Sequence, residues 1–90
     1  MTLDDGAIDA ALGRLPGWRR EGRALARTYQ FADFRAALAF VNRVGEVAEA
    51  QQHHPDVAIH YSEVMLTLWS HDAGGVTERD LRLAAAIDAS

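Results

Sequence analysis

Hydrophobic residues recur at intervals of three and four positions in the longest regular stretch of the chain, which follows Asp33. The residues with this spacing are Phe34, Leu38, Val41, Val44 and Ala48. Such a period places side chains on one face of a helix, and aspartate is a preferred N-cap residue. Because the residue before proline is disfavoured in the α conformation, Pro55 predicts that this helix ends between Gln52 and His54.

Shorter stretches with alternating or β-branched residues lie on both sides of this helix. They span residues 18–20, 24–31, 57–61 and 64–71. Turns at Glu21-Gly22 and Ser62-Glu63 join them in pairs, which predicts two antiparallel hairpins. In the last stretch Val64, Leu66 and Leu68 are expected to face the helices, with Met65, Thr67, Trp69 and His71 on the opposite face. Arg27 shares a side with core residues, so it lies toward a sheet edge or extends its aliphatic stem over the core.

Two further helices are predicted at the ends of the chain. The first is capped by Thr2 or Asp4 and stopped by Pro16-Gly17. The last begins at Thr77, with Asp80 three residues later as in a capping box. Its expected apolar side is formed by Leu81, Ala84, Ala85 and Ile87. The predicted order is αββαββα in one domain, residues 1–90: a two-layer α+β fold with a four-stranded antiparallel sheet and helices packed on one face.

Composition limits the classes of protein to consider. The 90 residues are 49% hydrophobic and 24% charged, as in ordinary globular domains. A chain this short buries only roughly 60–65% of its unfolded surface, so a homodimer or homotetramer is expected. The nine basic residues are all arginine, are not clustered, and leave a net charge of −4, which argues against nucleic-acid binding. The acidic N-terminus and the lack of a long apolar run predict a cytoplasmic protein without membrane association.

Most of the candidate chemistry lies between Glu49 and Asp80. His53 and His54 follow a predicted helix C-terminus, where the macrodipole favours a protonated imidazole suited to general acid catalysis. Glu49 precedes His53 by four residues and can orient an imidazole. Because the chain entering Pro55 is extended, the two histidines diverge and are expected to have different roles.

Structural explanations compete with these assignments. His-His-Pro also fits a polar helix terminus, His71 and His60 fit exposed strand positions, and both Trp18 and Trp69 fit a core. Asp80 is explained by capping alone, and Arg79 by the exposed first turn of a helix. A zinc site from Glu49, His53, His54 and His71 is a further alternative, although adjacent histidines rarely chelate one ion.

The spacing of these residues resembles the pattern of the pterin-4a-carbinolamine dehydratase family. The matching positions are Glu49, His53, His54, Pro55, Tyr61, His71 and Asp80. The similarity extends outward to Gly17-Trp18 and to the ranges 31–34 and 75–81. Several spaced positions in order are much more specific than one short motif, and the fold of the family matches the predicted one.

The resemblance implies a lyase that eliminates water from a 4a-hydroxytetrahydropterin, giving quinonoid dihydropterin for tetrahydrobiopterin-type recycling alongside an aromatic amino acid hydroxylase. The pterin is then the substrate, and neither a redox cofactor nor a metal is implied. By the same resemblance, His53 and His71 transfer protons and His54 binds and stabilises the substrate. Glu49 tunes a histidine, Trp18 forms a wall of the pocket, and Arg79 and Asp80 support it.

The same family also implies an alternative without catalysis. Animal members act as dimerisation cofactors of a homeodomain transcription factor, and some relatives assist assembly. A non-catalytic interaction or assembly role on the same fold is therefore the competing hypothesis, and retention of His53, His54 and His71 favours catalysis.

Overall fold

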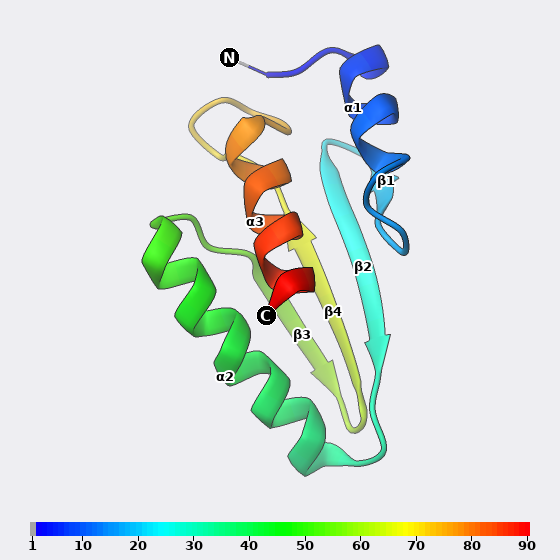
Figure 1. The fold of residues 1–90 in the computed structure, drawn as a ribbon, viewed down its shortest axis with the longest axis vertical. Helices are drawn as coiled ribbons and strands as arrows, with labels where there is room; N and C mark the ends of the chain where they lie inside the picture. Colours follow the sequence, from blue (N-terminus) through cyan, green and yellow to red (C-terminus); the bar gives the residue numbers. More distant parts are fainter. Residues whose placement is uncertain (1) are drawn as a thin grey trace.

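The computed structural model describes residues 2–90 and confirms the predicted αββαββα order (Figure 1). The elements are α1 (Asp5–Leu12), β1 (Arg19–Glu21), β2 (Ala24–Gln30), α2 (Phe34–Gln51), β3 (Asp56–His60), β4 (Glu63–Leu68) and α3 (Glu78–Ala89). Each helix begins at a predicted cap: Asp4, Asp33 and Thr77 provide side-chain oxygens that accept backbone N–H groups of the first turn. Local sequence therefore sets where the helices begin.

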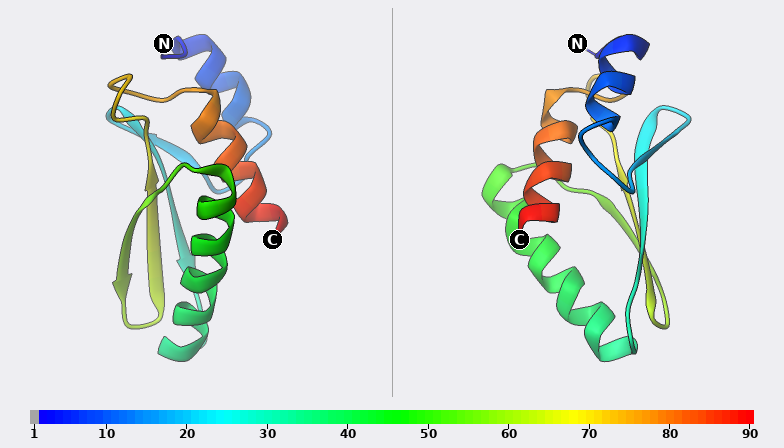
Figure 2. Two further views of the ribbon diagram at one scale, coloured as in Figure 1. Left: turned by 90° about the vertical axis from the view of Figure 1, so that its left-hand side faces the viewer. Right: turned by 45° about the vertical axis from the view of Figure 1, so that its right-hand side comes forward.

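The four strands form one antiparallel sheet in the order β1-β2-β4-β3. Figure 2 shows α2 and α3 on the same face of this sheet, as predicted for a two-layer α+β fold. Residues directly opposite one another in the register share a face, so Leu66 of β4 lies with Arg27 of β2 and Val57 of β3 on the helix side. Arg27 lies just beyond the last pair of β1 and β2, which is Arg19 with Ala26, so it has an edge-like position as expected.

The core lies between the sheet and the helices. Val64, Leu66 and Leu68 have no exposed surface, which confirms their predicted orientation. They pack with residues from the other elements, including Leu25, Val44, Leu83 and Ile87.

The apolar face predicted for α2 is partly wrong. Phe34 and Leu38 are 46% and 40% exposed, whereas the buried positions are Ala37, Phe40, Val44 and Ala48. Spacings of three and four residues fit both sets, and the aromatic neighbours decide between them. The Phe40 ring packs 4.5 Å from that of Tyr29 and 5.0 Å from that of Phe31, measured between centroids.

The prediction for α3 is also partly wrong. Ala85 is exposed and Leu81 only half buried, while Leu83 is fully buried with Ala84 and Ile87. The reason is that the Asp80 side chain points into the protein and has no exposed surface. The face of α3 that carries Asp80, Leu83 and Ile87 is therefore buried, and the face that carries Leu81 and Ala85 is turned toward the surface.

The strand predicted over residues 64–71 is shorter than expected. β4 ends at Leu68, Ser70 forms an isolated antiparallel bridge with Gly75, and His71 lies in the turn between them. The preceding turn is at Tyr61-Ser62, one residue earlier than predicted. Within residues 2–90 no helix is both long and apolar enough to cross a membrane.

Candidate active site

The end of α2 directs the first histidine away from the helix. Gln52 adopts a left-handed conformation with φ of 52°, and the backbone N–H of His53 donates to the Ala48 carbonyl at 3.1 Å. This satisfies a terminal carbonyl and reverses the chain just before Pro55. His53 therefore does not continue the helical face that carries Glu49.

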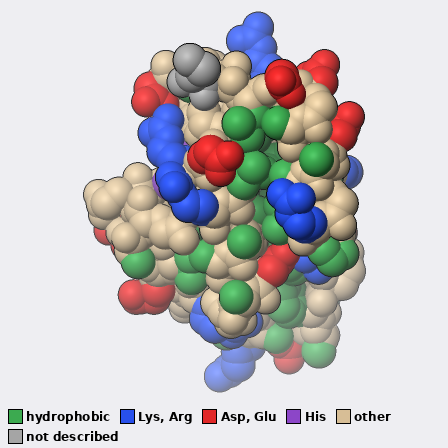
Figure 3. Space-filling model, turned by 45° about the horizontal axis from the view of Figure 1, so that its top comes forward, with side chains coloured by type: hydrophobic (Ala, Val, Ile, Leu, Met, Phe, Trp, Pro, Cys, Tyr) green, Lys and Arg blue, Asp and Glu red, His purple; other side chains and the backbone are tan. Residues whose placement is uncertain are grey.

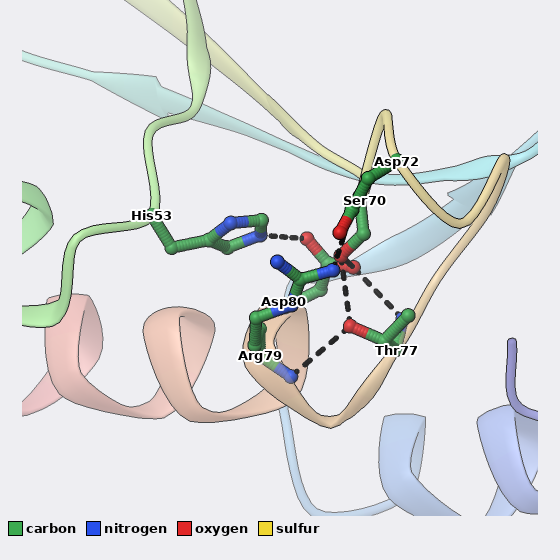
Figure 4. Close-up of polar contacts among 6 residues, drawn as sticks. All are labelled: His53, Ser70, Asp72, Thr77, Arg79 and Asp80. Atoms are coloured by element: carbon green, nitrogen blue, oxygen red, sulfur yellow. Dashed lines mark hydrogen bonds and ion pairs between the residues drawn. The ribbon is translucent and has the colours of Figure 1, made fainter. Parts of the chain in front are cut away.

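His53 instead meets the start of α3. Its Nε2 lies 2.6 Å from Oδ1 of Asp80, 27 residues later in the chain (Figure 4). The Asp80 side chain has no exposed surface and that of His53 is 11% exposed, so little water competes for this bond. A buried carboxylate that contacts one ring nitrogen fixes the orientation of the imidazole.

The second oxygen of Asp80 closes the N-terminus of α3. Oδ2 accepts the backbone N–H of Thr77 at 2.8 Å and the Ser70 hydroxyl at 2.9 Å. The Ser70 and Thr77 hydroxyl oxygens are 2.8 Å apart. Asp80 thus completes the predicted capping box and also binds His53, so capping and a role in the site are combined in one side chain.

His54 has a different partner from His53. Its Nε2 is 2.5 Å from Oε2 of Glu49, and both side chains are largely exposed, at 57% and 71%. The sequence left open which histidine Glu49 would orient. The geometry pairs Glu49 with His54, and the two adjacent histidines have separate carboxylates as their diverging positions suggested.

His71 lies in the exposed turn that follows β4. Its ring is 4.0 Å from that of Trp69, centroid to centroid, with the two planes 32° apart. The next residue, Asp72, accepts a hydrogen bond from the Arg79 guanidinium at 2.6 Å, which holds the pKa of the Asp72 carboxyl below its usual range. The ion pair joins the turn to the first turn of α3. Figure 3 shows that acidic and basic side chains are interspersed at this end of the molecule.

These elements surround an open hollow of about 390 Å³. It is lined by Gln52, His53, His54, Pro55, Asp56, Trp69, His71, Asp72 and Arg79. The three candidate histidines and Arg79 are therefore brought together, with Asp80 beneath His53. A neighbouring hollow of about 380 Å³ shares His53 and Arg79 and adds Gln51 and Arg82. A larger hollow of about 530 Å³ lies by Asp88 near the other end of α3 and is lined by no histidine.

Trp18 does not line the histidine hollow, in contrast to the expected wall. It is 5% exposed, and its Nε1–H donates to Oδ2 of Asp88 in the last turn of α3 at 2.8 Å. Eight residues separate Asp88 from Asp80, which corresponds to about 12 Å along a helix. Trp69 is the aromatic residue of the hollow. The alternation of the strand places it on the same side as His71, but a core position was the favoured interpretation for both tryptophans, so the sequence did not assign Trp69 to the site.

Ser70 and Thr77 also contribute to the site without having been predicted to. Thr77 had a local signal as a helix cap, whereas Ser70 had none, because its contact with Asp80 depends on the turn between them. In residues 2–90 no group of three or more histidine and carboxylate side chains is arranged to hold a metal ion. The site provides two imidazole–carboxylate pairs and a third imidazole, which are groups that can give and accept protons.

Comparison with known proteins gives consistent results. The whole chain, residues 1–90, matches the family described as pterin 4 alpha carbinolamine dehydratase. A relative from Thermomicrobium roseum, provisionally named as a pterin-4-alpha-carbinolamine dehydratase, is 57% identical over 82 residues, covering 91% of this chain and 88% of the relative. A relative from Koribacter versatilis with the same provisional name is 51% identical over 87 residues, covering 97% of this chain and 93% of the relative.

Two solved structures share the fold. A transcriptional coactivator/pterin dehydratase from Brucella melitensis superimposes with a TM-score of 0.94 at 33% identity, covering 99% of this chain and 97% of that one. A pterin dehydratase-like RuBisCO assembly factor of the alpha-carboxysome superimposes with a TM-score of 0.69 at 24% identity, covering 81% of this chain and 87% of that one. The second similarity concerns the fold alone.

Proposed function

Because the chain belongs to the pterin 4 alpha carbinolamine dehydratase family, we propose that it is a lyase that eliminates water from a 4a-hydroxytetrahydropterin. The observation that carries the proposal is the pairing of His53 with the buried Asp80 at a hollow that also holds His54 and His71. The elimination requires one proton delivered and one removed, and the hollow supplies several imidazoles for the task.

The chemistry balances with protons alone. The bond from C4a to oxygen breaks as the oxygen receives a proton and leaves as water, while a ring nitrogen loses its proton and the product is a quinonoid dihydropterin. We assign these two transfers to His53 and His71, each contributing on the order of 10²–10⁴-fold. The product would enter tetrahydrobiopterin-type recycling, downstream of an aromatic amino acid hydroxylase.

The geometry supports a specific role for each nitrogen of His53. Since an ionised carboxylate only accepts hydrogen bonds, the Nε2 atom that faces Asp80 carries the proton. Within residues 2–90 Nδ1 makes no hydrogen bond, so it is the nitrogen left for exchange with the substrate. Asp80 stabilises the positive charge when His53 becomes an imidazolium.

The remaining residues of the hollow bind the substrate in this proposal. His54, oriented by Glu49, contacts a polar edge of the pterin, and Arg79 holds the His71 turn through Asp72. Trp69 takes the place that the sequence assigned to Trp18, because its ring lies against His71 in the hollow and offers a flat surface to a flat substrate.

Stopped-flow dehydration of a synthetic 4a-hydroxytetrahydropterin tests the proposal. His53→Ala and His71→Ala should each lower the rate by at least about 10²-fold while remaining folded, because each removes one proton transfer. His54→Ala should mainly raise KM. His60→Ala is the matched control, since His60 lies on β3 and does not line the hollow, and it should be fully active.

Full activity in both His53→Ala and His71→Ala would contradict these assignments. The reaction as proposed needs no cofactor, so the wild-type rate should be unchanged after dialysis against a chelator. A non-catalytic interaction or assembly role predicts instead that replacing His53, His54 and His71 together leaves the biological activity intact.

A further inference from the structure

One buried polar residue beside the hollow has no part in the proton transfers just described. Ser70 has no exposed surface, and its hydroxyl lies between Thr77 and Asp80. We propose that Ser70 is a positioning residue, whose hydroxyl fixes the Asp80 carboxylate so that Oδ1 holds His53 in one tautomer and one orientation. The kinetic part of this inference rests on the proposed function, whereas its effect on the His53 ring does not.

The directions of the hydrogen bonds follow from the number of protons available. Asp80 Oδ2 can only accept, so the single hydroxyl proton of Ser70 is donated to it. Thr77 must then donate its own hydroxyl proton to Ser70 Oγ at 2.8 Å. The backbone N–H of Arg79 donates to Thr77 Oγ1 at 3.2 Å, so the Thr77 hydroxyl also accepts a hydrogen bond.

Figure 4 draws these contacts as dashed lines, and the donor assignments above make them a chain of hydrogen bonds that ends at Asp80. His53 donates to the other oxygen of the same carboxylate, so Asp80 accepts hydrogen bonds from both sides. Because the network is buried and fully satisfied, the low local dielectric strengthens each bond and disfavours alternative orientations.

The backbone of Ser70 is held as firmly as its side chain. Its N–H donates to the Gly75 carbonyl at 2.8 Å, and its own carbonyl accepts the N–H groups of Gly74 at 2.8 Å and Ala73 at 3.1 Å. These bonds close the turn that carries His71. Ser70 therefore connects the base of the His71 turn to the carboxylate that orients His53.

Loss of the hydroxyl would act on orientation more than on the helix cap. In a Ser70→Ala variant Oδ2 still accepts the Thr77 backbone N–H, so the start of α3 is retained. The carboxylate loses a lateral donor, and Thr77 loses the acceptor for its hydroxyl proton. Asp80 can then rotate, and His53 is no longer restricted to the tautomer with the proton on Nε2.

The test compares Ser70→Ala with Ser70→Thr, which keeps the hydroxyl, and with Ser62→Ala, a serine truncation in the turn between β3 and β4. Nitrogen-15 NMR of the His53 ring should show one tautomer in the wild type, Ser70→Thr and Ser62→Ala, and a mixture in Ser70→Ala. In the dehydration assay kcat should fall about 10- to 100-fold in Ser70→Ala, with KM unchanged and Ser70→Thr restoring the rate.

The proposal is overturned if His53 keeps its wild-type tautomer in the Ser70→Ala variant. This holds also if the melting temperature of the variant is lower than that of the wild type. It is also overturned if Ser70→Thr shows the same tautomer mixture as Ser70→Ala. If the wild type shows no dehydratase activity but the tautomer responds as expected, the proposed function fails while the positioning role of Ser70 is supported.

Discussion

Asp88 gathers three side chains at the last turn of α3. Its Oδ1 accepts the Tyr29 hydroxyl and its Oδ2 the Trp18 indole N–H, both at 2.8 Å, and the Arg27 guanidinium lies 3.1 Å from Oδ2. Arg27 also stacks 4.5 Å from the centroid of the Tyr29 ring and donates to the Pro16 carbonyl. Burial of Tyr29 and its bond to Asp88 raise the pKa of the phenol above its usual value of 10.0.

The raised pKa of Tyr29 predicts how stability depends on alkaline pH. Since the folded protein favours the neutral phenol, this contribution is fully present below about pH 10 and is lost as the pH rises further. The difference in unfolding free energy between the wild type and Tyr29→Phe should be constant from pH 7 to 9 and decrease from pH 10 upward. Urea titrations across this range measure it, and a difference that grows above pH 10 would contradict the assignment.

At the scale of elements, α3 is fixed at both of its ends by a carboxylate. Asp80 in the first turn binds His53 and Ser70, and Asp88 in the last turn binds Trp18 and Tyr29. The two ends thereby join the helix to the α2–β3 connection on one side and to β2 on the other. The histidine hollow lies at the end held by Asp80.

Two aspartates at helix N-termini provide a comparison of stability. Asp80→Ala removes the capping-box carboxylate of α3 together with its buried hydrogen bonds and should cost about 2–4 kcal/mol of unfolding free energy. Asp33→Ala removes the exposed N-cap of α2 and should cost about 1 kcal/mol, because within residues 2–90 the Asp33 side chain makes one hydrogen bond, to the Ala36 N–H. Chemical denaturation measures both, and equal losses would show that the buried contacts of Asp80 add nothing to its capping.

At the scale of the whole molecule, several large apolar side chains remain at the surface. They are Phe34, Leu38, Val57, Tyr61 and Met65, with exposed fractions between 36% and 71%. Phe34 and Leu38 are one helical turn apart on α2 and were predicted to lie in a core. The exposed apolar pair on α2 agrees with the homodimer or homotetramer expected from the short chain.

Light scattering tests the expected assembly. The wild type should have two or four times the chain mass of 9.9 kDa, because association would cover the exposed side chains of Phe34 and Leu38 on α2. Leu38→Glu should lower the measured mass, whereas Ala10→Glu on the exposed side of α1 should leave it unchanged. A wild-type mass of one chain at the highest concentration tested would refute the expectation.

The amino-acid sequence by itself determined the order of the elements, the caps of α2 and α3 and the end of α2 before Pro55. It restricted the cap of α1 to Thr2 or Asp4, and the structure selects Asp4. These features depend on contacts within a few residues: capping oxygens reach N–H groups two or three positions away, and proline restricts its immediate neighbour. The alternation of Val64, Leu66 and Leu68 was likewise sufficient to orient β4, because a strand has only two faces.

Only the tertiary structure decided which side of each helix is buried and which partner each histidine has. A helix offers overlapping apolar stripes, and the packing of Phe40 on Tyr29 and Phe31 selects one of them. His53 could have paired with Glu49 nearby, but the left-handed residue Gln52 turns it toward Asp80. Contacts between residues that are 10 or 27 positions apart depend on how turns and helices are placed in space, which no local pattern specifies.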